Sequence, residues 1–93
     1  MATLQFIFVP DQNMRFKLIG AIQSTSLAQL DELLKSRRFW RNTSDDPNVA
    51  EWWSDIPVNE IRLKNDVAGA ADAFCVVEGI HTSKIYMESD TQS

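Results

Sequence analysis

The chain has 93 residues, of which 44% are hydrophobic and 24% charged, a composition that describes one ordinary globular domain and excludes a disordered tail or a coiled coil. Its formal net charge of -4 opposes nonspecific binding to nucleic acids and anionic membranes, which carry the same sign. The longest apolar run, residues 6–10, is far shorter than the roughly 20 residues that cross a bilayer, so we expect no membrane contact. The single cysteine permits no internal disulfide and suits the reducing cytoplasm, where we expect the protein to reside.

Residues 1–88 are expected to fold as one domain, followed by a frayed polar tail at residues 89–93. The first two elements are predicted to be strands, because apolar and polar side chains alternate over residues 3–9 and again from Met14 to Ile19. The sequence Pro-Asp-Gln-Asn between them is typical of a turn, so the two strands should pair as a hairpin.

The stretch from Ser24 to Arg41 has the clearest helical period in the chain. Its leucines recur at spacings of three and four residues and form one apolar stripe, made of Leu27, Leu30, Leu33 and Leu34. At the start, Ser26 and Gln29 fit a capping box, in which the two side chains satisfy backbone donors of the first turn. Positive charge in the last turn complements the helix dipole and comes from Lys35, Arg37 and Arg38. The stripe predicts a helix that packs on an apolar layer.

A short second helix is predicted at residues 47–54. Asp46 fits the N-cap position and Pro47 the first helical position. Trp52 and Trp53 would point about 100° apart on such a helix, so one of the two indoles should remain partly exposed.

The rest of the chain is predicted to add three strands, at residues 58–64, 73–78 and 84–88, with a turn at residues 79–83. Residues 66–73 have no large apolar side chains and are expected to form a loop or one helical turn. The resulting order, ββααβββ, has its helices gathered in the middle. It favours an α+β two-layer sandwich: an antiparallel sheet of four to five strands with one main helix and one short helix on one face.

Side chains that could perform chemistry are few. Cys75 and His81 would make a thiolate nucleophile only if the imidazole reached the sulfur, and Cys75 lies in an apolar stretch typical of a buried thiol. One histidine and one cysteine do not fill a tetrahedral zinc site, and the sequence has no phosphate-binding loop. We therefore expect no enzymatic activity, metal or cofactor, with cysteine chemistry at Cys75 and His81 as the alternative.

Positive and aromatic side chains occur together at the end of the main helix. Residues 35–41 contain four cations around Phe39 and Trp40, a mixture that can hold a phosphate backbone while a ring stacks on a base. The acidic balance of the whole chain opposes this use. A nucleic-acid-associated regulator that uses residues 35–41 is therefore the alternative function.

The charge changes sign directly downstream, where carboxylates accompany the two adjacent tryptophans. Tryptophan and arginine are enriched at binding hot spots. We therefore predict a small non-catalytic protein-protein interaction module that acts by occlusion, such as a phage or mobile-element inhibitor of a host complex. Its protein partner should have a basic or mixed-charge surface. The predicted partner-binding residues are Arg37, Arg38, Trp40, Arg41, Asp45, Asp46, Glu51, Trp52, Trp53 and Asp55.

Overall fold

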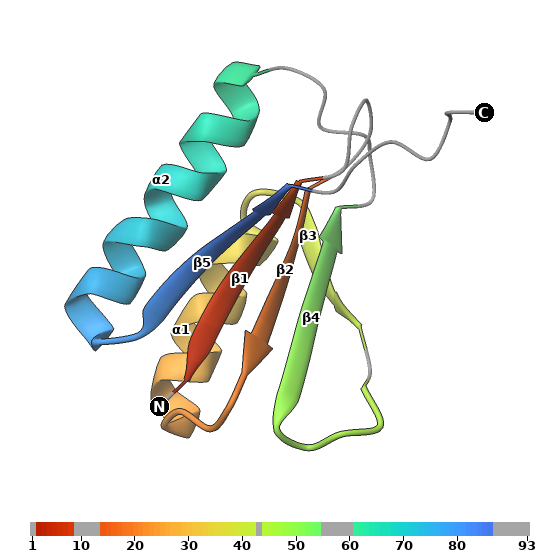
Figure 1. Ribbon diagram of the computed structural model, residues 1–93, viewed down its shortest axis with the longest axis vertical. Helices are drawn as coiled ribbons and strands as arrows, with labels where there is room; N and C mark the ends of the chain where they lie inside the picture. Colours follow the sequence, from red (N-terminus) through yellow and green to blue (C-terminus); the bar gives the residue numbers. More distant parts are fainter. Residues whose placement is uncertain (1, 9–13, 43, 55–60, 87–93) are drawn as a thin grey trace.

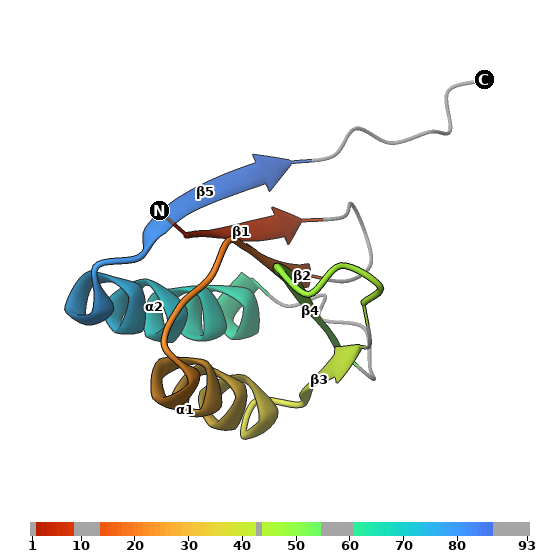
Figure 2. The ribbon, with the colours of Figure 1, turned by 90° about the horizontal axis from the view of Figure 1, so that it is seen from below.

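The computed structural model describes residues 2–8, 14–42, 44–54 and 61–86, with side chains described from residue 65 onward in the last of these segments. They form one five-stranded sheet, with two helices packed on one of its faces (Figures 1 and 2). This arrangement confirms the predicted α+β class. The strands are β1 (Thr3–Phe8), β2 (Met14–Ile19), β3 (Phe39–Asn42), β4 (Val49–Ser54) and β5 (His81–Tyr86), and the helices are α1 (Ser24–Lys35) and α2 (Ile61–Glu78).

The strands follow the spatial order β3-β4-β2-β1-β5. Three neighbouring pairs are antiparallel, namely β1 with β2, β2 with β4 and β3 with β4, whereas β1 and β5 are parallel. The prediction of an antiparallel sheet in the order ββααβββ is therefore wrong in these details, because the sheet is mixed and the order is ββαββαβ. Each helix connects two strands that run in the same direction. Two parallel strands must be joined by a crossover segment, and here each helix is one such segment. The helices therefore occur at two separate places in the sequence and not together in its middle.

The predicted N-terminal hairpin is confirmed, with Phe6 opposite Phe16 in the register of β1 and β2. Both rings are fully buried, and Phe16 also packs edge-on against Phe39 at a centroid distance of 5.1 Å. Leu30 and Leu34 of α1 belong to the same buried cluster. Burial of each of these side chains contributes about 1.5 to 3 kcal/mol, so the cluster decides how α1 lies on the sheet.

α1 ends at Lys35, earlier than predicted. Arg38 adopts a φ of 69°, a left-handed conformation of the kind that ends helices, and its N–H donates to the Lys35 carbonyl oxygen at 3.0 Å. Arg37 and Arg38 therefore lie beyond the helix and not in its last turn. The predicted capping box is also wrong, because the Ser26 hydroxyl donates to the Glu78 carboxylate of α2 at 2.5 Å.

β3 and β4 lie where the sequence predicted the end of one helix and the whole of another. The predicted second helix is wrong, since buried Ala50 and Trp52 alternate with half-buried neighbours in the two-residue period of a strand. Asp46 does not cap a helix. Its Oδ1 accepts the Asn48 N–H at 2.9 Å, in a turn that leads into β4.

α2 replaces the strands and the loop predicted for this part of the chain. Its buried residues recur at helical spacing and are mostly small, namely Val67, Ala68, Ala71 and Cys75. Gly79 follows the helix with a φ of 73°, and the Ile80 N–H donates to the Cys75 carbonyl oxygen at 2.9 Å. This bond is the usual signature of a helix that ends at a left-handed glycine.

Residues 61–64, 66–73 and 73–78 are thus all helical. The strands predicted for residues 61–64 and 73–78 are wrong, and residues 66–73 belong to a longer helix than the loop or single helical turn expected there. The last predicted strand is confirmed in part, because β5 begins at His81, within the predicted turn. Three other predicted segments lie outside the described residues, namely the turn at residues 10–13, the start of a strand at residues 58–60 and the tail at residues 89–93.

Candidate functional site

Alternation of side chains along β3 and β4 separates the residues that were predicted to bind a partner. Trp40, Glu51 and Trp53 point to the sheet face opposite the two described helices, which we call the helix-free face, whereas Trp52 and Arg41 point to the helix side. The other predicted residues lie elsewhere: Arg37 and Arg38 follow α1, Asp45 and Asp46 lie between β3 and β4, and Asp55 lies outside the described residues. The predicted set therefore does not form one continuous surface.

Trp52 belongs to the core, contrary to its predicted place in a binding surface. Its side chain is fully buried, and its indole N–H donates to Asp31 Oδ1 of α1 at 2.9 Å. A buried donor without a partner would cost about 1 to 3 kcal/mol, so this bond is what allows an indole to lie here. Because consecutive strand residues point to opposite faces, burial of Trp52 also places Trp53 on the helix-free face.

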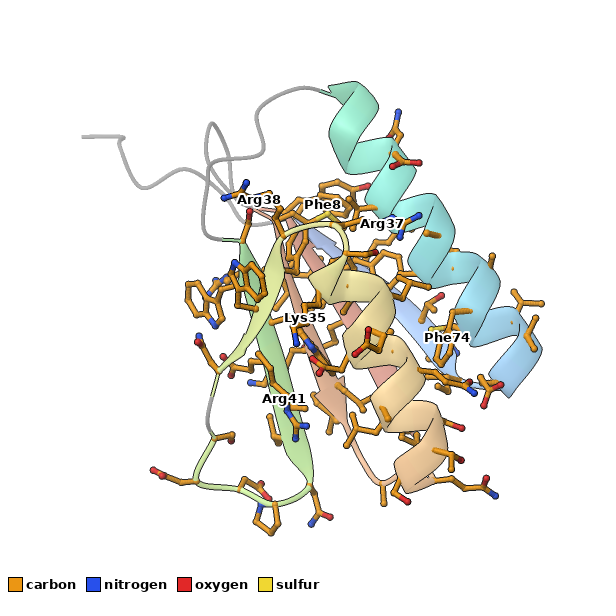
Figure 3. The ribbon with its side chains drawn as sticks, turned by 180° about the vertical axis from the view of Figure 1, so that it is seen from behind. Phe8, Lys35, Arg37, Arg38, Arg41 and Phe74 are labelled. Atoms are coloured by element: carbon orange, nitrogen blue, oxygen red, sulfur yellow. The ribbon has the colours of Figure 1, made fainter. Side chains whose placement is uncertain are left out.

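The nucleic-acid alternative requires the basic and aromatic side chains after α1 to share one surface. Phe39 is fully buried, and Trp40 and Arg41 point to opposite faces of the sheet. Arg37 is directed toward α2 (Figure 3), where its Nε lies 4.0 Å from a carboxylate oxygen of Asp66. These side chains therefore do not share one surface.

A row of five side chains crosses the helix-free face from one edge of the sheet to the other. Trp40 lies opposite Trp53, and Trp53 lies opposite Arg15. Arg15 lies opposite Ile7, which is the neighbour of Ile85 in β5. Each strand contributes one residue to this row, which we call the tryptophan row.

Trp53 is held in place from two sides within the tryptophan row. The guanidinium carbon of Arg15 lies 4.3 Å from the ring centroid of Trp53, and the indole N–H donates to Glu51 Oε1 at 3.2 Å. A cation-π contact at an exposed site contributes about 0.5 to 1 kcal/mol. Beside Trp53, on the edge strand β3, Trp40 is 42% exposed. The two indoles thus lie side by side: the Trp53 ring is held by Arg15 and Glu51, and the Trp40 ring is exposed at the sheet edge.

The charge of the helix-free face differs from that of the whole chain. Its described ionisable groups are Arg15, Lys17, Glu51 and His81, which gives a charge of +1 when histidine is neutral. Outside this face, the described charged side chains comprise five lysines and arginines and seven aspartates and glutamates, a charge of -2. Exposed Ile19 adds apolar area to the same face. The face therefore combines aromatic, aliphatic and positive groups, while seven of the eight described acidic side chains lie elsewhere.

Three members of the tryptophan row were absent from the predicted site, namely Arg15, Ile7 and Ile85. The alternation of β1 and β2 does indicate that Arg15 and Ile7 point away from the core. Trp53, however, was predicted to lie on a helix, and no helix would pair with β2. The contact between Arg15 and Trp53 therefore could not be predicted from the pattern of apolar and polar residues.

Cys75 and His81 do not form a catalytic pair. Cys75 is fully buried on the helix side of the sheet, whereas His81 is exposed and shares a register position with Thr3, which points to the helix-free face. Burial, and then the neighbouring carboxylate of Asp72, raise the pKa of the Cys75 thiol to about 11. At neutral pH the thiol is protonated and is a poor nucleophile.

Within the described residues, no three histidine, cysteine or carboxylate side chains lie close enough together to hold a metal ion. Neither α1 nor α2, the two helices that the structure describes, combines the length and apolar character needed to cross a bilayer. Comparison of the chain with models of protein families, with curated proteins and with solved structures found no match.

Proposed function

We propose that the chain is a small protein-interaction module and that the helix-free sheet face is its binding surface. The observation that carries this proposal is the tryptophan row, in which Trp40, Trp53 and Arg15 lie side by side. Tryptophan and arginine are the residue types most often found at the energetic centre of protein interfaces. Here they occur together on the face opposite α1 and α2 (Figure 2).

Preorganisation supports the same proposal. Trp53 is already fixed by Arg15 and Glu51, so a partner that contacts its ring does not have to immobilise it. Ordering a mobile side chain at an interface costs about 0.5 to 1.5 kcal/mol, and this cost is avoided here. Five strands about 4.8 Å apart, of which β3 has four residues and the others six, give a face of about 20 Å by 20 Å, which suits a small, transient interface better than an obligate one.

The proposed partner is a protein with apolar groups and carboxylates on its surface. Arg15 and Lys17 lie in adjacent rows of the face and give it a positive character that the described residues outside the face do not share. Charges of opposite sign across an interface steer association and select against wrong partners. The module would act by covering its partner's surface, as an inhibitor or adaptor does.

Affinity capture with wild-type and variant chains tests the proposal. We expect the double variant Trp40→Ala/Trp53→Ala to lose a partner that the wild type retains, with an affinity lower by about tenfold or more. Val77→Ala is the matched control, because it removes an exposed apolar side chain of α2 away from the face. Far-UV circular dichroism checks that each variant is folded.

Isothermal titration calorimetry with the purified partner distinguishes direct binding from indirect capture, and its signal does not depend on the two tryptophans that the double variant lacks. Equal affinity of the wild type and the double variant would overturn the proposal. Single-stranded oligonucleotides form a second arm at low salt, because exposed indoles also stack on bases. Salt-sensitive oligonucleotide binding that requires Trp40 and Trp53 would replace the protein partner with a nucleic acid.

A further inference from the structure

The edge of the sheet formed by β5, together with the flank of α2 beside it, is a second surface of this molecule (Figures 1 and 2). β5 is the outermost described strand on this side. Two strongly exposed apolar side chains belong to this edge and flank: Val76 is 81% and Tyr86 71% exposed. An open strand edge and exposed apolar side chains are both features that another chain tends to cover.

We propose that this surface is the interface of a two-fold symmetric dimer, in which β5 pairs with β5 of a second copy and α2 packs beside its symmetry mate. A two-fold axis perpendicular to a sheet at its edge pairs the edge strand with itself in the antiparallel direction. It also keeps the helices of both copies on the same side. The same operation therefore covers the strand edge and the neighbouring flank of α2.

Ser83 and Lys84 lie at the centre of β5, so either of them on the axis pairs almost the whole strand, and the charge on Lys84 favours the register with Ser83 on the axis. The His81 N–H donates to the Ala2 carbonyl oxygen at 3.2 Å, so the backbone groups of odd-numbered β5 residues face β1. The backbone groups of Thr82 and Lys84 therefore face the open edge. With Ser83 on the axis, Thr82 pairs with Lys84 of the second copy. With Lys84 on the axis, two like charges would face each other, which is unfavourable.

The flank of α2 nearest β5 is identified by an ion pair. Asp72 Oδ2 lies 3.4 Å from Lys84 Nζ, and both Gly69 and Val76 are on the same flank because they are three and four residues from Asp72. A Cβ atom on Gly69 would meet nothing within 4 Å, so this flank is open to close approach. In the dimer each Lys84 lies between Asp72 of its own chain and Asp72 of the second copy, which makes the charges complementary.

Disulfide trapping tests the proposed register. Residues at a non-hydrogen-bonded antiparallel pair have Cα atoms about 4.5 Å apart, within the range of a disulfide, so Ser83→Cys should give a covalent dimer on mild oxidation. His81→Cys is the control on the same strand and face, because its two copies would be about 13 Å apart. The native Cys75 is buried and does not compete. No cross-link with Ser83→Cys, or equal cross-linking of both variants, would overturn the proposal.

Sedimentation equilibrium of the full chain provides the second test. Val76→Lys should raise the dimer dissociation constant by about tenfold or more, whereas Val77→Lys, equally exposed but rotated about 100° away from the flank, should leave it unchanged. A wild-type chain that stays monomeric up to about 1 mM, or equal weakening by both variants, would refute the dimer. These substitutions do not touch Trp40 or Trp53, so the dimer and the proposed function fail separately.

Discussion

The hydrogen bond between Trp52 and Asp31 joins β4 to α1, and we expect it to contribute measurably to stability. The indole N–H lies 2.9 Å from Asp31 Oδ1, and the Trp52 side chain is fully buried while Asp31 is half-buried. Hydrogen bonds to charged groups contribute about 1.5 to 3 kcal/mol. Partial exposure of the carboxylate places this bond near the lower end, at about 1 to 2 kcal/mol.

A double-mutant cycle with Asp31→Ala and Trp52→Phe isolates that bond. Neither single variant measures it cleanly, because Trp52→Phe also leaves unfilled volume in the core. The coupling between the two substitutions cancels this packing loss. The free energy of unfolding is measured by urea denaturation, followed by circular dichroism, for the four proteins of the cycle. Each kcal/mol should also lower the melting temperature by about 4 to 8 °C in a domain of this size.

Glu32→Ala is the control, because it removes the neighbouring, exposed carboxylate of α1 and should change the unfolding free energy by less than about 0.5 kcal/mol. A coupling below about 0.5 kcal/mol between Asp31→Ala and Trp52→Phe would refute the reasoning. In that case packing alone, and not the hydrogen bond, would orient the indole. The result also concerns the proposed surface, since the burial of Trp52 places Trp53 on the opposite face.

Three further predictions follow from buried or constrained groups. The pKa of the Cys75 thiol rises from 9.0 to about 11 on folding, so between these pH values the folded chain keeps a proton that the unfolded chain releases. The free energy of unfolding of the wild type, relative to that of Cys75→Ala, should therefore fall by about 2 to 3 kcal/mol as the pH rises from about 9 to 11, as measured by urea titration. Arg38→Gly should be more stable than Arg38→Ala by about 1 kcal/mol in thermal melts, since both remove the side chain and only glycine adopts the left-handed backbone without strain; the reverse order would contradict this account. Ser26→Ala should lower the unfolding free energy by about 1 kcal/mol through loss of its bond to Glu78, and unchanged stability would show that the bond contributes nothing.

Part of this fold is encoded in short stretches of sequence. The alternation in β1 and β2 and the leucine stripe of α1 predicted these elements and their buried faces, because each pattern repeats with the period of its own backbone. α2 had no such signal. Its buried face consists largely of small side chains such as Ala71 and Cys75, while β-branched Val76 and Val77, which suggest a strand, are exposed.

The sequence by itself determined the α+β class, the hairpin and the core of the main helix. The tertiary structure decided that the segment with Trp52 and Trp53 is a strand, because only that geometry buries one indole against Asp31 of α1. It also decided that Trp53 lies beside Arg15 and Trp40. Periodicity specifies which side of an element is buried, but the partner across the sheet depends on packing between distant segments. The proposed binding face is a product of that packing.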